Sequence, residues 1–309
     1  MATSDENGPD VTTAQRIGYP PDARVLIINA DDFGMCHDEN EATIIGLTQG
    51  LFTSSTILTT CPWFEEVADF ARRTPTADLG VHLTLNSEWD RYKWGPVLGH
   101  SDVPSLTDDR GYLWPNVPSV FEHDRLNEVE IELQAQIEKA IAAGIDVTHL
   151  DCHMGPLHMR ADYHRVYLKL AVNFRLPIRL TSRQVMRQLG MGDILSDLDC
   201  NGILYPDHFV HPGPSHLDQT ESFWTDLLRS LKPGISEIYC HPALARDELK
   251  SCALDWQQRQ RDFEFFTSQK IRQLVKDEGI ELIGYRKLRD ATNSTLSDPP
   301  SPSGEGAGG

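Results

Sequence analysis

The stretch that decides the fold is Val25–Gly34, VLIINADDFG, in which an apolar run ends in two adjacent acids, Asp31 and Asp32. An apolar run that ends in charge is typical of a buried strand reaching its carboxyl end. Within a strand, neighbouring carboxylates point to opposite faces, but at a strand-to-loop junction both can reach one pocket. Two charges this close repel each other, so the pair predicts a bound cation or a shared proton. The alternative is that one acid caps the next helix and the other is solvated.

Two further segments read as strand ends that carry titratable residues. Leu79–Leu85 (LGVHLTL) holds His82, and Val147–His153 (VTHLDCH) holds three such residues at alternate positions, namely His149, Asp151 and His153. Alternation puts these three on one face, where each needs a buried partner, and a metal ion supplies one. A hydrogen-bonded core histidine remains the alternative for His82. A polar strand facing solvent remains the alternative for the third segment, although the apolar lead-in at Ile145 and Val147 disfavours it.

Apolar strands alternate with helical patterns along most of the chain. We expect strands at 24–29, 54–60, 78–85, 147–152, 177–181, 236–241 and 281–285, with a further one around 203–210. Helical periodicity is present in 39–49, 125–143, 162–174 and 255–278. Repeated βαβ units predict an α/β fold in which parallel strands form a TIM-like barrel, either closed or distorted and incomplete.

In such barrels the reactive residues gather at the carboxyl ends of the strands. Asp31, Asp32 and His153 fall at such ends, as does His241 after the apolar run Ile235–Cys240, whereas His82 lies further inside its strand. A carboxylate and imidazoles that converge there can hold one divalent metal and leave a second carboxylate as a base, which suits metal-assisted hydrolysis.

Composition indicates one domain and argues against two classes of partner. The 309 residues include 46 acidic and 28 basic side chains, a net charge of −18, which opposes binding to nucleic acid and to anionic membranes. We expect a flexible extension at 1–21, a catalytic domain at 22–292 and a disordered Ser/Pro/Gly-rich tail at 293–309. The sequence does not determine the oligomeric state, and a homo-oligomer is compatible with it.

The cysteines and the chain start indicate a cytoplasmic protein. None of the six cysteines pairs in a CxxC motif, which is typical of reduced thiols. The first 21 residues contain no apolar signal core, and no apolar run approaches the ~20 residues of a membrane span.

Four motifs resemble those of one known family, the YdjC-like carbohydrate deacetylases, which include the chitooligosaccharide deacetylases of the ChbG type. They are NADDFG (29–34), GVHLTL (80–85), THLDCH (148–153) and CHPA (240–243), and they occur in the family order across about residues 22 to 290. One departure concerns the third motif. The family usually continues with further histidines at alternate positions, whereas Met154–Leu157 intervene here before His158.

The resemblance implies a role for each motif residue. Asp32, His82 and His153 would bind a divalent metal, Asp31 would be the catalytic base and His241 the general acid, with His149, Asp151 and His158 supporting the metal ligands or the substrate. The family favours Mg²⁺, whereas two imidazoles and one carboxylate suit Zn²⁺ or another transition metal better. Without the resemblance, a loop or capping histidine is an equal alternative for His241.

An irregular insertion at 87–120 follows the His82 strand and holds Trp89, Trp94 and Trp114. A loop in this position begins near the metal, and aromatic faces match the C–H surface of a sugar ring, so we expect one of the three to contact substrate. The alternative is a cover that packs only on itself.

Together these features predict a metal-dependent hydrolase that removes acetyl groups from N-acetylated amino sugars or short oligosaccharides, a small carbohydrate substrate. One rival is another barrel hydrolase such as a phosphoesterase, for which Arg160 and Arg183 are the candidate phosphate clamps. The other rival is a non-catalytic carbohydrate-binding protein, which would not need both Asp31 and Asp32.

Overall fold

The computed structural model describes residues 11–181, 183–188, 190–213 and 216–295. Its centre is a parallel sheet in the order β4-β3-β2-β1-β6-β5, with β7 pairing beside β1. The strands are β1 (Arg24–Phe33), β2 (Ser54–Ile57), β3 (Leu79–Leu83), β4 (Val147–Cys152), β5 (His208–Val210), β6 (Gly234–Cys240) and β7 (Glu281–Leu282). The sheet curls into an incomplete barrel, as the βαβ pattern predicts.

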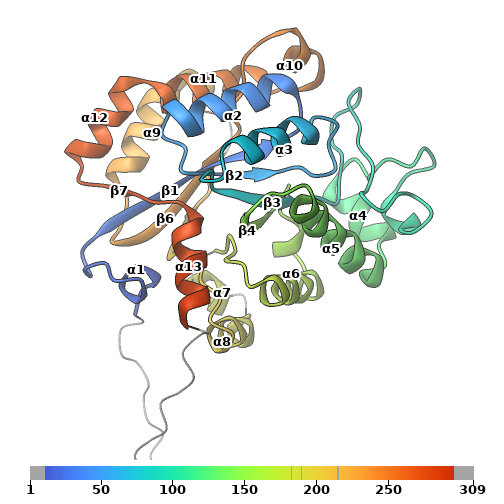
Figure 1. The fold of residues 1–309 in the computed structure, drawn as a ribbon, viewed down its shortest axis with the longest axis horizontal. Coiled ribbons are helices and arrows are strands. Elements are labelled where there is room, and N and C mark those ends of the chain that lie inside the picture. The colour runs from blue at the N-terminus through green and yellow to red at the C-terminus, as the bar shows by residue number, and fades with distance from the viewer. Residues whose placement is uncertain (1–10, 182, 189, 214–215, 296–309) are drawn as a thin grey trace, which may run out of the picture.

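Helices surround the outside of this sheet (Figure 1). The longer ones are α2 (His37–Gln49), α3 (Phe64–Arg73), α5 (Leu126–Ala142), α6 (Ala161–Phe174), α8 (Gly192–Cys200), α9 (Thr220–Arg229), α11 (Trp256–Thr267), α12 (Gln269–Asp277) and α13 (Tyr285–Thr295). The shorter ones are α1 (Thr13–Arg16), α4 (Val117–His123), α7 (Arg183–Gln188) and α10 (Asp247–Cys252). None of the helices within the described ranges is long and apolar enough to cross a membrane.

Successive side chains of β1 point alternately to the outside and to the inside of the barrel. Leu26 and Ile28 point outward and pack with Trp224 of α9 and Phe266 of α11. Residues on the other face point inward, and Ile27 joins an apolar floor that includes Tyr285 of α13. This packing fixes the register that carries Asp31 into the barrel interior.

Several expected elements are shorter or interrupted in the structure, and the strands expected at 54–60 and around 203–210 are limited to Ser54–Ile57 and His208–Val210. At 177–181 only an isolated bridge, Leu150 to Ile178, is present. Pro177 has no N–H to extend the ladder on one side, and on the other side the Arg179 carbonyl accepts from the Tyr167 hydroxyl at 3.1 Å. The expected helix 255–278 is interrupted at Ser268, whose extended backbone and side chain cap the start of α12. The strand expected at 281–285 ends at Leu282, before α13 begins.

The expected domain boundaries stay a prediction. Part of 1–21 is described: α1 packs beside β6, and the N–H groups of Thr13 and Ala14 donate to the Asp207 carboxylate at 2.6 and 3.1 Å. Residues 1–10 and 296–309, which hold the first ten residues of the expected extension and most of the expected tail, lie outside the described residues.

Candidate metal centre and active site

Both acids of the opening stretch face one pocket because β1 is irregular where they lie. The pairing of β1 with β2 shifts register between Ala30 and Phe33, and Asp32 adopts a left-handed φ of +66°. A non-glycine residue in this conformation costs about 1–2 kcal/mol, so the surrounding structure must hold it there. The irregularity overcomes the strand rule that would send Asp31 and Asp32 to opposite faces.

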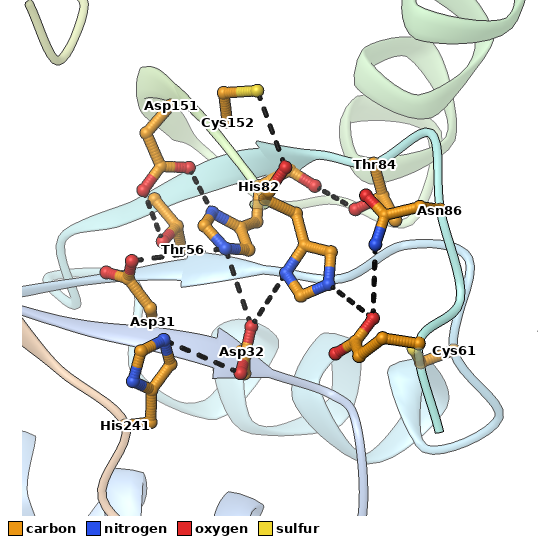
Figure 2. A network of polar contacts seen from close by, with 12 residues as sticks. Asp31, Asp32, Thr56, Cys61, His82, Thr84, Asn86, Asp151, Cys152 and His241 are labelled. Atoms are coloured by element: carbon orange, nitrogen blue, oxygen red, sulfur yellow. Dashed lines mark hydrogen bonds and ion pairs between the residues drawn. The ribbon is translucent and has the colours of Figure 1, made fainter. Parts of the chain in front are cut away.

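Asp32, His82 and His153 form a buried group whose ligand atoms lie within 4.8 Å of one another. The Asp32 Oδ1 atom lies 3.4 Å from His82 Nε2 and 3.2 Å from His153 Nδ1. Figure 2 shows His82 between Asp151 and Asp32. Oδ1 is buried and has no hydrogen-bond partner, which is costly unless a cation satisfies it. One carboxylate and two imidazoles therefore fit a divalent metal with further coordination positions open.

In a second group of possible ligands, Asp31, His82 and Asp151, the two carboxylates already contact a cation of the protein itself. Arg179 Nη1 lies 2.7 Å from Asp31 Oδ2 and 2.8 Å from Asp151 Oδ2. The guanidinium therefore already pairs with both carboxylates of this group. This leaves the Asp32 group as the metal candidate of the described residues.

Asp151 orients the imidazole of His82. Its Oδ1 lies 2.5 Å from His82 Nδ1, which leaves Nε2 facing Asp32. Burial alone would lower the pKa of His82, but the carboxylates of Asp151, Asp32 and Asp31 raise that pKa to about 9. Metal binding to His82 must therefore displace a proton.

Asp31 is held as an ionised carboxylate. Burial alone would raise its pKa, but the charge and hydrogen bonds of Arg179, together with His82 and His241, lower the pKa of Asp31 to about 2. Arg179 contacts both of its oxygens, and Asn29 donates to Oδ1 at 2.8 Å. Asp31 is therefore ionised at neutral pH, which is the state that a general base needs.

His241 follows β6 and approaches the same acids from the other side (Figure 2). Its Nε2 lies 3.8 Å from Asp32 Oδ2, and 34% of its side chain is exposed. An imidazole that is open to the cavity can exchange a proton with a bound molecule.

A cavity of about 720 Å³ opens over these residues. Charged groups on its wall include Asp255 and two arginines, Arg179 and Arg259. Its apolar and aromatic lining comes from Trp89, Met154, Met159, Phe209 and Tyr239, and the histidines on it are His82, His153, His158, His211 and His241. This mixture of apolar walls and a few charged groups is typical of a small-molecule site.

The three tryptophans of the insertion lie in different environments. Trp89 lines the cavity. Trp94 is only 2% exposed and meets His153 edge-on, with ring centroids 6.1 Å apart. Trp114 stacks on His123 at 4.0 Å and does not line the cavity. Trp89 is the one tryptophan of the three that a substrate in this cavity could touch.

His149 lies deeper in the barrel than the other motif histidines. Its ring stacks on Tyr285 at 3.8 Å, Thr148 is its hydrogen-bond partner at 2.9 Å, and its approach leaves no room for a Cβ at Gly80. Asp151 contacts His82 and Arg179, whereas His149 contacts floor residues. His158 lines the cavity, and burial, followed by the charges of His164 and Arg179, lowers its pKa to about 3.

The sequence reasoning missed three charged residues of the site. Arg179 clamps Asp31, Arg259 lies 3.0 Å from Asp32 Oδ2, and Glu88 contacts His153. A signal for Arg179 existed, because a charged residue in the apolar run Pro177–Leu180 needs buried partners. Arg259 lies in a helix rich in polar residues, which gave no such signal.

The fold and this group place the chain among α/β barrel proteins whose chemistry lies at the carboxyl ends of the strands. The sequence family described as YdjC-like protein matches residues 25–277. The chain is 32% identical over 267 residues to a carbohydrate deacetylase of Enterococcus faecalis, covering 85% of this chain and 97% of that protein. It is 31% identical over 278 residues to a carbohydrate deacetylase of Thermus thermophilus, covering 87% and 95%.

A solved structure agrees with the sequence matches. It is that of an E. faecalis protein described as a proposed cellobiose-phosphate cleavage protein, with a TM-score of 0.73, 31% identity, and coverage of 86% of this chain and 99% of that chain. The chain belongs to the YdjC-like family.

Proposed function

We propose that the protein is a metal-dependent hydrolase that removes the acetyl group from N-acetylated amino sugars or short oligosaccharides. The observation that carries the proposal is the pairing of an ionised, Arg179-clamped Asp31 with the separate group of Asp32, His82 and His153. Family membership and the deacetylase names of the relatives support the same activity.

Each residue of the site has a separate role in the proposed reaction. Asp32, His82 and His153 would hold the ion, which when bound polarises the amide carbonyl and acidifies a water. Asp31 accepts the proton of the attacking water, and Arg179 keeps both of its oxygens in place. His241 donates a proton to the leaving amine from the open side of the cavity. The family resemblance favours Mg²⁺ as the bound ion, whereas the ligand types, two imidazoles and one carboxylate, favour Zn²⁺.

The positions and partners of the arginines argue against a phosphoesterase. Arg160 pairs with Asp124 and Asp162, Arg183 pairs with Asp199, and neither lines the cavity. The two arginines that do line it are each surrounded by carboxylates: Arg179 by Asp31, Asp151 and Glu237, and Arg259 by Asp32, Glu39 and Asp255. A phosphoryl group would have to compete with these internal anions.

A panel assay tests the proposal. Acetate release is measured from N-acetylglucosamine, its short β-1,4 oligomers and other N-acetylated sugars, with chelator and after separate return of Mg²⁺ or Zn²⁺. We expect chelator-sensitive release that one metal restores. Elemental analysis of His82→Ala and His153→Ala should show loss of the ion, and unchanged metal content in both would refute the ligand assignment. A non-catalytic binding protein would hold these sugars and release no acetate.

The cellular location completes the proposal. The six cysteines are free thiols, which fits a reducing compartment, so we place the enzyme in the cytoplasm.

A further inference from the structure

Glu88 stands immediately behind one of the imidazoles of the proposed metal site. Its Oε2 lies 3.0 Å from His153 Nε2, while Nδ1 of the same ring lies 3.2 Å from Asp32 Oδ1. The two carboxylates therefore contact opposite nitrogens of one buried ring. Glu88 does not belong to the group of converging ligand atoms, and 17% of its side chain is exposed.

The other imidazole has the same arrangement. His82 presents Nδ1 to Asp151 and Nε2 to Asp32. A neutral imidazole carries one N–H and one lone pair, so a carboxylate that accepts the N–H turns the lone pair toward the opposite side. Both lone pairs then face Asp32, where a cation would bind. Metal-binding histidines commonly have such a carboxylate behind them.

We propose that Glu88 is a positioning residue of the metal site, which fixes the tautomer and ring orientation of His153 as Asp151 does for His82. The inference rests on the metal dependence of the proposed function. It gives the insertion at 87–120 a role in the metal site as well as in lining the cavity, because the start of that insertion supplies the carboxylate.

The loop around Glu88 is built to hold this position. Trp94 donates from its backbone N–H to Ser87 Oγ at 3.1 Å and from its indole N–H to the Asn86 carbonyl at 3.0 Å. Asn86 also donates to Glu88 Oε2 at 3.3 Å. The buried Trp94 ring meets the His153 ring edge-on, so the same loop lies against both the ring and the Nε2 atom of His153.

Metal titration of the apoprotein tests the role of Glu88. Calorimetry with Zn²⁺, and separately with Mg²⁺, is applied to the wild type, Glu88→Ala, Glu88→Gln and the control Asp90→Asn, which removes an exposed charge from the same loop. Glu88→Ala should weaken binding by about 10–100-fold with one ion still bound. Glu88→Gln should weaken it less, because an uncharged amide oxygen can still accept the N–H. Asp90→Asn should bind as the wild type does.

Two outcomes would overturn the inference. Wild-type affinity in Glu88→Ala would show that His153 needs no support from Glu88. Complete loss of stoichiometric binding in both Glu88 variants, with circular dichroism unchanged, would make Glu88 a direct ligand. Failure of the proposed function looks different: the wild type would bind one ion and release no acetate, while the effect of Glu88 on binding would persist.

Discussion

Arg179 holds Asp31 by both carboxylate oxygens, with Nη1 2.7 Å from Oδ2 and Nη2 2.8 Å from Oδ1. Its Nε contacts Glu237 at 2.9 Å, so the planar guanidinium is fixed by its own partners. The orientation of the proposed base is thus set by a residue that is not expected to touch the attacking water.

Arg179→Lys should therefore lower kcat by about 10²-fold, because a lysine cannot hold both oxygens at once and a misplaced base is costly. Metal content should not change. The control is Arg246→Lys, which alters a two-pronged pair with Glu41 at the surface. Steady-state kinetics at saturating substrate would check this, and equal kcat in both variants would contradict it.

Asp31→Asn keeps the shape of the side chain but cannot accept a proton. Turnover should fall by about 10²–10⁴-fold while the ion stays bound. Acetate release and elemental analysis on the same preparation measure both quantities. Near-normal turnover would exclude Asp31 as the base, and loss of the ion would make it a ligand.

Trp89→Ala should lower kcat/KM for an N-acetylated oligosaccharide more than for the monosaccharide, because Trp89 lines the cavity. Trp114→Ala is the matched control, since that ring stacks on His123 instead. Kinetics with both substrates distinguish the cases. If Trp89→Ala behaves as Trp114→Ala does, sugar recognition must come from other lining residues.

A phosphorylated N-acetyl sugar should be a poorer substrate than its neutral counterpart. The guanidiniums of Arg179 and Arg259 are engaged by carboxylates, Asp255 among them, and Glu88 adds negative charge to the wall. We expect kcat/KM to fall by at least about 10-fold, or ~1.4 kcal/mol, on adding a 6-phosphate. Competition between the two sugars in one reaction measures the ratio directly, and a preference for the phosphorylated one would contradict this account.

Asp78 should make stability depend on pH. Burial raises its pKa to about 6, despite the hydrogen bonds from Thr148 and from the Arg286 N–H, which lower it. The folded state then binds the proton more tightly than the unfolded state does. The contribution of Asp78 to the free energy of unfolding is therefore fully present below pH ~4 and falls by roughly 3 kcal/mol as the pH rises through about 6. Urea unfolding of the apoprotein at several pH values in this range measures the free energy of unfolding, which should decrease less with pH in Asp78→Asn than in the wild type. Asp109→Asn, at an exposed position, should keep the wild-type slope.

Much of this arrangement could be predicted from sequence because strand ends combine two strong local signals. An apolar run followed by charge located Asp31, Asp32, His153 and His241, and the βαβ pattern placed those ends at one edge of a sheet. The motif order identified the family for the same reason, since the motifs are these strand ends.

The remainder depended on long-range geometry. The left-handed Asp32 and the register shift in β1 leave no mark in the residue types, so the direction of the two acids could not be derived. Arg179 meets Asp31 across 148 positions of sequence, and Arg259 meets Asp32 across 227. Tryptophan is a residue type that often stacks on sugars, but two hydrogen bonds within its own loop hold Trp94 in a buried position.

The Tyr285 contacts described for the barrel floor bear on how the enzyme is made. The Tyr285 hydroxyl donates to Glu237 at 2.5 Å, Glu237 accepts from Arg179, and Arg179 clamps Asp31. Helix α13, which starts at this tyrosine, lies beside β4 (Figure 1). During synthesis on the ribosome, Asp31 emerges about 250 residues before the helix that completes its chain of supports. The contact of Tyr285 with Glu237 can therefore form only after strands β1 to β6 have all been synthesised.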